Sequence, residues 1–305
     1  MANFYLPDDA NQQIYLDANA TTPVLPEIAD VVSHTMQVCF GNPSSSHITG
    51  IQAKHLLEQT RNKAREVIGA ADGDILFTSG ATEGIQTAVV STLIAAKNHQ
   101  IENPVLLYGA TEHKAVPNTL KHWNSVLDIN AQVLAIPVDK NGILDHEFIR
   151  KHAANALMIC TMAVNNETGV FQDLSAIEQV IRSENTHVAW MVDCVQALGK
   201  TNLALSQTTI DYAPFSGHKL YAPKGIGVLY IRKGSAYTPF IAGGGQESGM
   251  RSGTENLPGI AGLNKLFSLL LDKQNQTFKP IEQLHAFREQ LLAALTDTFG
   301  SITFN

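Results

Sequence analysis

The stretch DILFTSGATEGIQTAVVSTLIAAK, residues 74–97, contains the structural unit that decides the fold class. Residues 74–78 form a short apolar run, which is typical of a strand buried on both faces. Ser79 and Gly80 then form a turn of small residues, and a candidate helix begins at residue 81. A strand followed directly by a helix is the unit that repeats in α/β proteins.

The same alternation continues along the chain in both directions. Several further runs are apolar at nearly every position, and segments with helical spacing lie between and beyond them. The remaining predicted strands cover 104–109, 133–138, 156–164, 188–193 and 226–231, and the remaining predicted helices cover 54–69, 173–184 and 279–300. We therefore expect an α/β fold with a mainly parallel sheet of about seven strands between helices.

Length, charge and cysteine content exclude several classes of protein. The 305 residues indicate one large domain with a smaller part, or two domains. A net charge of -7 argues against a nucleic-acid-binding surface. Cys39, Cys160 and Cys194 form no CxxC pair, so we expect neither a metal site nor disulfides, and Cys160 and Cys194 read as buried packing residues. No apolar run approaches the roughly 20 residues of a membrane helix, and the N-terminus does not resemble a signal peptide. We expect a cytoplasmic protein.

The turn within FTSGATEGIQ, residues 77–86, is a candidate phosphate site. A helix that begins after a strand directs free backbone N–H groups and a positive dipole end toward a bound anion. Gly80 allows close approach of the backbone, and Thr82 offers a hydroxyl group. An ordinary capped strand–helix turn explains the pattern as well, because it matches neither the P-loop nor the GxGxxG fingerprint.

Asp193 lies where an apolar run ends in VDCVQALGK, residues 192–200. Ligands of open α/β sheets bind at the carboxyl ends of the strands. An acid in an apolar wall needs a cationic partner, and a protonated pyridine nitrogen would provide one. The alternative is that Asp193 caps the segment that follows.

Lys219 follows Ser216 and His218 on a turn within DYAPFSGHKLYAPKGIGVLYIR, residues 211–232. A lysine on a tight turn near an apolar wall loses its proton more easily and can form a Schiff base with an aldehyde. A single lysine is more often a solvated surface charge. A phosphate-binding turn, an aspartate at a strand end and a later lysine are, however, the three anchors that pyridoxal 5'-phosphate requires.

Eight short motifs in order, from residue 15 to about residue 262, resemble those of the cysteine desulfurases in the class V aminotransferase family. They are YLDANATTPV, GNPSSSH, FTSGATE, TEHKAV, NNETGVFQDL, VDCVQALGK, FSGHKLYAPKGIG and GGGQESGMRSGTEN. The resemblance implies a fold-type I pyridoxal-phosphate-dependent enzyme. It places an N-terminal segment of a small domain at 1–14, the cofactor-binding large domain at 15–262 and the start of a truncated C-terminal small domain at 263–305.

The resemblance also assigns roles to individual residues. Lys219 is the Schiff-base lysine and moves the substrate α-proton, and His113 stacks on the pyridine ring and takes part in proton transfer. Asp193 pairs with the ring nitrogen, Gln196 binds the ring 3-oxygen, and Asn166 lies beside the ring and reaches the substrate.

The phosphate, the substrate entrance and the partners complete the implied site. Thr82, Ser216 and His218 hold the phosphate, and Thr254 reaches it from the other subunit of a homodimer. Asn42 lies in a loop that lines the substrate entrance. The implied substrate is L-cysteine, whose sulfur passes as a persulfide to acceptor or scaffold proteins for iron–sulfur cluster or thionucleoside assembly.

One part of the family pattern has no match in this sequence. The nucleophilic cysteine and the carboxylate-binding arginine of the C-terminal region are absent, and the final SITFN reads as the beginning of a strand. Three functions therefore remain open. They are cysteine desulfuration, a selenocysteine lyase or other pyridoxal-phosphate-dependent elimination, and a non-catalytic cofactor-binding dimer. The apolar stripe on the helix at 279–300 is predicted to be an association surface.

Overall fold

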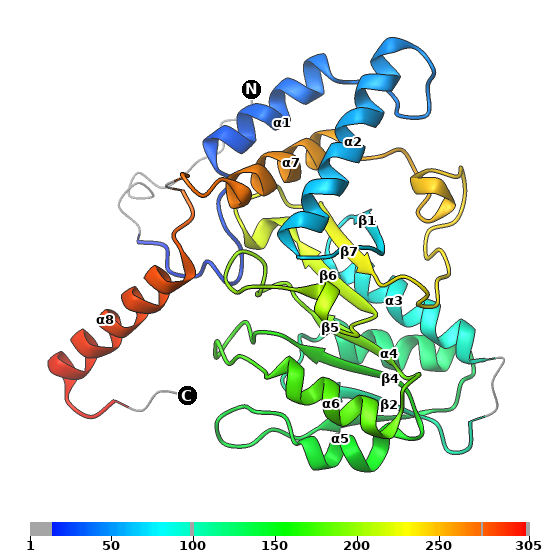
Figure 1. Cartoon of the computed structure of the whole chain (residues 1–305), viewed down its shortest axis with the longest axis vertical. Coiled ribbons are helices and arrows are strands. Elements are labelled where there is room, and N and C mark those ends of the chain that lie inside the picture. The colour runs from blue at the N-terminus through cyan, green and yellow to red at the C-terminus, as the bar shows by residue number, and fades with distance from the viewer. Residues whose placement is uncertain (1–13, 98–100, 276, 303–305) are drawn as a thin grey trace, which may run out of the picture.

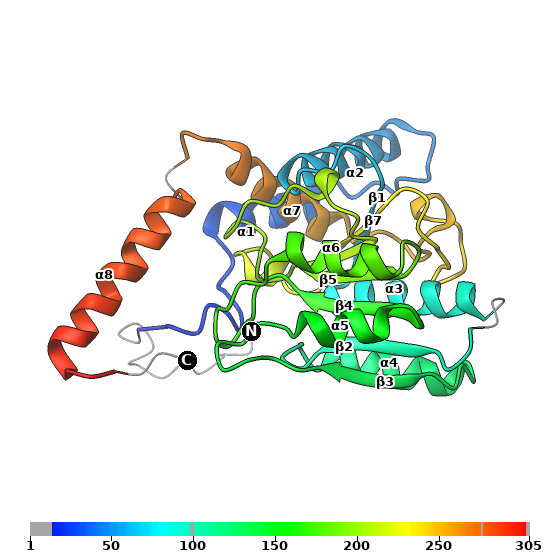
Figure 2. The same cartoon turned by 60° about the horizontal axis from the view of Figure 1, so that its bottom comes forward.

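The computed structural model describes residues 14–97, 101–275 and 277–302. A seven-stranded sheet with helices on both faces forms the body of the structure, and a final helix extends away from that body (Figures 1 and 2). The strands are β1 (Asp74–Thr78), β2 (Val105–Gly109), β3 (Gln132–Ile136), β4 (Ala156–Met162), β5 (Ala189–Asp193), β6 (Tyr212–Ser216) and β7 (Gly227–Ile231).

The strand order in the sheet is β1-β7-β6-β5-β4-β2-β3. Strand β7 runs antiparallel to both of its neighbours, β1 and β6, and the other neighbouring pairs are parallel. The carboxyl ends of the six parallel strands therefore meet at one edge of the sheet, together with the start of β7. This edge is where ligands bind in open α/β sheets.

Two helical layers cover the sheet. The helices of these layers are α1 (Pro26–Val38), α2 (Ile48–Val67), α3 (Ala81–Ala96), α4 (Ala115–Val126), α5 (His146–Ala153), α6 (Leu174–Glu184) and α7 (Leu257–Leu271), and the final helix, α8 (Ile281–Phe299), lies outside them (Figures 1 and 2). Helices α3 and α4 pack with one core, and α1, α2, α5, α6 and α7 pack with the other. Alternate residues of the strands enter the two cores: Trp190 and Val192 of β5 enter one, and Met191 enters the other. This double burial explains the unbroken apolar runs of the sequence.

The predicted fold class is confirmed, and the predicted strands lie within two residues of the observed bounds. The predicted helix at 54–69 begins earlier, at Ile48, where His47 caps it. Helices α1, α4, α5 and α7 were not predicted. The proposed domain boundary after residue 262 stays a prediction, and α7 runs across it. Residues 1–13 and the last three residues of SITFN lie outside the described residues.

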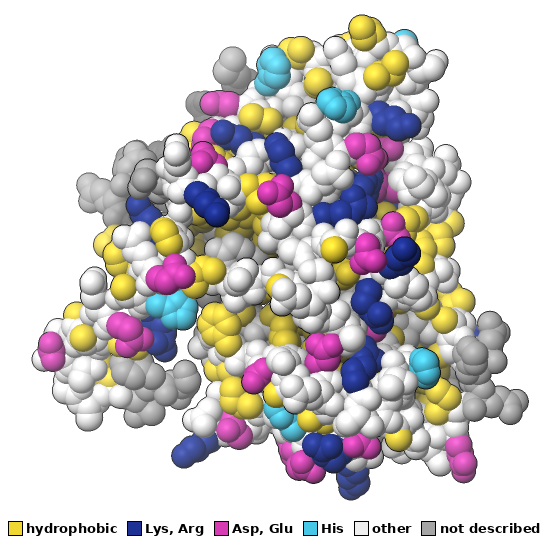
Figure 3. Space-filling view, viewed as in Figure 1, with side chains coloured by type: hydrophobic (Ala, Val, Ile, Leu, Met, Phe, Trp, Pro, Cys, Tyr) yellow, Lys and Arg dark blue, Asp and Glu magenta, His cyan; other side chains and the backbone are white. Residues whose placement is uncertain are grey.

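Helix α8 has no buried residue. Leu284, Phe287 and Leu291 are 39%, 48% and 59% exposed, and hydrophobic side chains show on this part of the molecule in Figure 3. Large apolar side chains at helical spacing normally pack against another element. The predicted apolar stripe is therefore exposed in this chain.

Among the described residues, no helix is long and apolar enough to span a bilayer. Within the same ranges, no group of three or more His, Cys, Asp or Glu side chains is arranged to hold a metal ion.

Candidate active site

A cavity of about 450 Å³ lies at the edge where the parallel strands end. We call it the cofactor cavity. Its walls come from the segments that follow β1, β2, β4, β5 and β6, and from the turn before β7. Its size lies within the range of about 300–1,000 Å³ that is usual for small-molecule sites.

Most of the residues predicted for the site line this one cavity. They are Thr82, His113, Asn166, Asp193, Gln196, Ser216, His218 and Lys219. Thr254 is exposed and is not among the lining residues of its own chain. Asn42 lies on the exposed loop between α1 and α2 and does not line the cavity either. The lining also includes Lys224.

The start of α3 closes one end of the cavity. Gly80 precedes this helix with a φ of 155°, a conformation that favours glycine. A Cβ on Gly227 would lie 2.8 Å from the Cα of Gly80, so β7 approaches this turn more closely than a side chain would allow. No side chain of the described residues caps α3, and the first residues of this helix line the cavity beside Ser216. The arrangement fits a phosphate group.

Glu83, in the first turn of α3, also lines the cavity, but its charge is already paired. Its carboxylate accepts hydrogen bonds from Nε and Nη2 of Arg251, at 2.9 and 3.2 Å, and from the N–H of Ser79, at 2.8 Å. Burial alone would raise the pKa of Glu83, yet these bonds lower it below its ordinary value. Glu83 therefore fixes the turn and does not repel a bound anion with an unpaired charge.

Lys219 is held over the cavity by a segment from the other end of the chain. Its Nζ donates hydrogen bonds to the backbone carbonyls of Asn19 and Ala20, at 2.7 and 2.9 Å. Thr22 fixes the same turn, because its hydroxyl donates to the carbonyl of His218 and accepts from the N–H of Tyr221, at 2.9 and 2.7 Å. Burial lowers the pKa of the Lys219 ammonium, although Asp193 and Asp17 oppose the shift. A lowered pKa makes the amine a better nucleophile.

Asp193 ends β5 and is only 6% exposed. One carboxylate oxygen accepts the N–H of Val195 at 2.9 Å. Burial raises the pKa of Asp193, and the nearby charges of His113 and Lys219 oppose this shift. A buried carboxylate with an oxygen facing a cavity is stabilised by a cation in that cavity, and a protonated pyridine nitrogen fits this requirement.

The two histidines of the cavity are held differently. Nδ1 of His113 accepts the N–H of Ala115 at 3.2 Å, which places the proton of the neutral ring on Nε2. Nδ1 of His218 lies 3.1 Å from the hydroxyl of Thr21. Burial lowers the pKa of His218, and the charges of Lys219 and Lys224 lower it further. His218 therefore favours its neutral form.

Asn166 faces the cavity because its neighbour forms the turn. Asn165 is buried, and its side-chain oxygen accepts the N–H groups of Glu167 and Thr168 at 2.9 and 2.8 Å. Its side-chain amide donates to the carbonyl of Thr111 at 3.0 Å. The first asparagine of the pair therefore shapes the loop after β4, and the second lines the cavity.

Lys200, which received no role from the sequence, belongs to the surroundings of the site. Its Nζ donates to the side-chain oxygen of Gln196 at 2.5 Å, and the Gln196 amide donates to the carbonyl of Asn19 at 3.0 Å. Burial, with the nearby charge of Lys219, lowers the pKa of Lys200 to about 8. These hydrogen bonds orient the side chain of Gln196. In the sequence, the contact is indicated only by the position of Lys200, four residues after Gln196.

Glu112 was also missed, although it precedes His113. Both of its carboxyl oxygens are buried and have no partner with normal hydrogen-bond geometry among the described residues. Burial, together with the charge of Asp193, raises the pKa of Glu112 well above its ordinary value. No residue pattern distinguishes such a buried glutamate from an exposed one.

None of the three cysteines lines the cofactor cavity. Cys160 and Cys194 are fully buried, as predicted, and burial raises the pKa of both thiols. A buried neutral thiol is a poor nucleophile. Cys39 is half-buried at the end of α1.

Comparison with known proteins identifies the family. The Aminotransferase class-V family model matches residues 14–303. A cysteine desulfurase of Trichormus azollae is 37% identical over 282 residues, which are 92% of this chain and 68% of that protein. A cysteine desulfurase IscS of Rickettsia prowazekii is 39% identical over 254 residues, which are 82% of this chain and 60% of that protein.

Solved structures agree with these relatives. A NifS-like protein superposes with a TM-score of 0.83 at 32% identity, covering 93% of this chain and 76% of that one. SspA in complex with cysteine superposes with a TM-score of 0.78 at 29% identity, covering 92% of this chain and 78% of that one. The chain therefore belongs to the class-V aminotransferase family and shares the fold-type I architecture and the pyridoxal 5'-phosphate dependence of its cysteine desulfurase relatives.

Proposed function

We propose that the chain is the cofactor-binding part of a cysteine desulfurase that converts L-cysteine to L-alanine. The sulfur passes to a thiol, so that L-cysteine and the thiol give L-alanine and a persulfide. The observation that carries the proposal is the convergence of eight predicted side chains, from the ends of five strands, on one cavity. Bound pyridoxal phosphate supplies a protonated ring that accepts the electron pair of a substrate carbon.

Three groups of the chain would hold the cofactor at its two ends and at its ring. The N–H groups at the start of α3, with Thr82, Ser216 and His218, would bind the phosphate. Asp193 would pair with the ring nitrogen, and Lys219 would bind the aldehyde carbon. The fit rests on the uncapped start of α3, the buried carboxylate and the lysine of lowered pKa.

The remaining residues of the cavity would act on the substrate. The amine of Lys219 would take the α-proton of L-cysteine and return a proton to the product. His113 would lie on the ring face and assist this transfer, and Asn166 would contact the substrate. Gln196, oriented by Lys200, would donate to the ring 3-oxygen. We place Asn42 at the substrate entrance, on a loop that does not contact the cavity in a single chain.

The proposal includes a homodimer and acceptor proteins. Thr254 is exposed and outside the cavity of its own chain, which is the arrangement expected of a residue that completes the site of a second copy. We propose that the persulfide sulfur serves iron–sulfur cluster or thionucleoside assembly, on the basis of the IscS relatives.

A second candidate is an elimination on the same cofactor, such as selenocysteine lyase activity. The observation that favours it is that no cysteine of this chain lines the cofactor cavity, so no thiol of the chain is placed to accept sulfur there. A lyase that splits selenocysteine into alanine and elemental selenium releases the chalcogen directly and needs no such thiol.

Product analysis distinguishes the two candidates. The chain, loaded with pyridoxal phosphate, is incubated with L-cysteine or L-selenocysteine, with and without dithiothreitol as the thiol acceptor, and alanine is quantified. Desulfuration predicts alanine from L-cysteine that depends on the added thiol. Alanine that forms from L-selenocysteine but not from L-cysteine would favour the lyase. Lys219→Ala should abolish both activities, and the exposed Lys233→Ala should retain them; activity of Lys219→Ala would refute both candidates.

A further inference from the structure

A second cavity, of about 600 Å³, lies at the opposite edge of the sheet. We call it the opposite-edge cavity. Its lining includes the starts of β4, β5 and β6, and Arg232, which follows β7. Strands β4, β5 and β6 thus contribute to this cavity with their first residues, and they lead to the cofactor cavity at their other ends. The two cavities are separate, and the proposed function does not use the second one.

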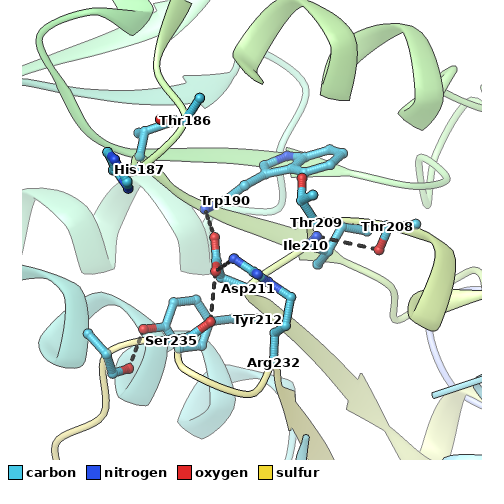
Figure 4. Close-up of polar contacts among 12 residues, drawn as sticks. Thr186, His187, Trp190, Thr208, Thr209, Ile210, Asp211, Tyr212, Arg232 and Ser235 are labelled. Carbon is cyan, nitrogen blue, oxygen red and sulfur yellow. Dashed lines mark hydrogen bonds and ion pairs between the residues drawn. The ribbon is translucent and has the colours of Figure 1, made fainter. Parts of the chain in front are cut away.

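Asp211 is the centre of the polar side of this cavity (Figure 4). Its carboxylate accepts the N–H of Trp190 at 2.8 Å and the hydroxyl of Ser235 at 2.7 Å. It also pairs with Nη2 of Arg182, at 3.5 Å, and with Nη2 of Arg232. Four donors satisfy this carboxylate, so it does not need a further cation.

All three nitrogens of the Arg182 guanidinium group donate hydrogen bonds to other groups of the protein. Nε donates to the hydroxyl of Thr209 at 2.8 Å, Nη1 donates to the carbonyls of Thr186 and Val188, and Nη2 donates to Thr209 and Asp211. This arginine therefore acts as a fixed positive charge at the wall of the cavity.

Arg232 differs from Arg182, because part of its guanidinium group has no partner among the residues that the structure describes. Its only side-chain hydrogen bond to the described residues runs from Nη2 to Asp211. Its Nε is buried and has no partner within those residues. A ligand cannot reach this buried N–H, but Nη1 makes no hydrogen bond to the described residues, and the Arg232 side chain is 36% exposed. The cavity has two arginine charges against one carboxylate, and an anion that accepts from Nη1 of Arg232 would balance the second charge.

About half of the remaining lining residues are aliphatic and form one apolar wall, which includes Ala96, Ile101, Leu157 and Val188. The other lining residues are mostly polar and include Asn185, Thr186 and His187. A phosphate group alone would leave this wall in contact with water, whereas a carboxylate on a short carbon chain would cover it. We propose that the opposite-edge cavity binds a small organic carboxylate with a short apolar body, whose oxygens accept hydrogen bonds from Arg232.

The test uses sodium butyrate as the probe and the full chain loaded with pyridoxal phosphate, so that the phosphate site of the cofactor cavity is filled. Saturation-transfer NMR and calorimetry measure binding to the wild type, Arg232→Gln and Arg150→Gln. Arg150 is an exposed arginine of α5 outside the cavity, so its variant loses the same charge elsewhere. We expect Arg232→Gln to weaken butyrate binding about tenfold or more, because it removes a charged donor, and Arg150→Gln to bind as the wild type does.

A second variant covers the case in which Arg232→Gln fails to fold. Ala96→Phe, at the half-buried end of α3, fills the cavity and leaves the pair of Arg232 and Asp211 in place, so it should abolish butyrate binding. n-Butanol, which lacks the carboxylate, should bind more weakly than butyrate. Equal butyrate affinity in a folded Arg232→Gln or Ala96→Phe protein would overturn the proposal. So would binding of inorganic phosphate, but not of butyrate, in a manner that depends on Arg232.

Discussion

At the scale of one residue, the buried carboxyl of Glu112 makes the free energy of unfolding depend on pH. Its carboxyl is buried without a hydrogen-bond partner of normal geometry among the described residues, and burial, with the charge of Asp193, raises its pKa. The folded state therefore holds this proton more tightly than the unfolded state does. The stabilisation is fully present below the unfolded pKa of about 4.3 and is lost as the pH rises through the raised folded pKa.

Glu112→Gln should therefore stabilise the chain increasingly as the pH rises. Glutamine keeps the shape of the side chain and cannot ionise, so the buried charge no longer arises at neutral pH. The free energy of unfolding, measured with urea, should be similar for the two proteins near pH 4.5 and should favour Glu112→Gln by about 1–3 kcal/mol at pH 8. A difference that does not change with pH would show that Glu112 titrates normally.

The residues of the site were predictable from the sequence where a short motif carries them. Asp193 and Lys219 follow predicted strands, and the topology of a parallel sheet brings such positions to one edge. The carbonyls of Asn19 and Ala20, which hold Lys219, could not be predicted, because the contact joins segments about 200 residues apart. The burial of Glu112 depends in the same way on packing that a single sequence does not reveal.

At the scale of elements, the segment around Thr22 fixes the turn that carries Lys219. The Thr22 side chain is only 3% exposed and makes two hydrogen bonds to that turn. Thr22→Val keeps the shape but leaves the N–H of Tyr221 without its acceptor. We expect a loss of about 1–3 kcal/mol in the free energy of unfolding and weaker binding of pyridoxal phosphate.

Urea unfolding and cofactor titration measure these two effects. Thr296→Val is the matched control, because Thr296 is exposed on α8 and its hydroxyl donates to the carbonyl of Leu292 in the same helix. Its effect should stay within about 0.5 kcal/mol. Equal stability and cofactor affinity for Thr22→Val and the wild type would show that this segment does not fix the Lys219 turn.

Helix α8 is the element whose apolar face is exposed. We expect the chain to associate through this face, with concentration-dependent sedimentation as the measurement. Replacing Phe287 and Leu291 by glutamate should shift the chain toward smaller species. Replacing Gln283 and Gln290 by glutamate adds the same charge to the same helix and should change the distribution less. An identical distribution for both double variants would mean that charge alone determines the association.

The elements themselves were predictable to different degrees. The strands are buried on both faces and appear as short apolar runs, so six of them were located by range. Helix α7 was missed because nine of its fifteen residues are buried, which obscures the helical period of apolar and polar positions. Helix α5 was missed for a different reason, since its eight residues span only about two turns.

At the scale of the whole molecule, the proposed dimer predicts complementation between two inactive variants. Lys219→Ala and Thr254→Val should each bind pyridoxal phosphate poorly. In a mixed dimer, one cofactor cavity would combine Lys219 of one chain with Thr254 of the other, and we expect co-expression to restore part of the desulfurase activity. If co-expression restores none while mixed dimers are present, Thr254 acts within its own chain or has no role.

The central claim is that the cofactor cavity binds pyridoxal phosphate through Lys219. The most direct measurement is the visible absorbance of the chain with pyridoxal phosphate, for the wild type beside Lys219→Ala and Lys233→Ala, followed by borohydride reduction and peptide mass mapping. We predict a yellow protein whose band requires Lys219 and not Lys233, with the reduced adduct on Lys219. A colourless wild type after addition of the cofactor, or an adduct on another lysine, would contradict the account.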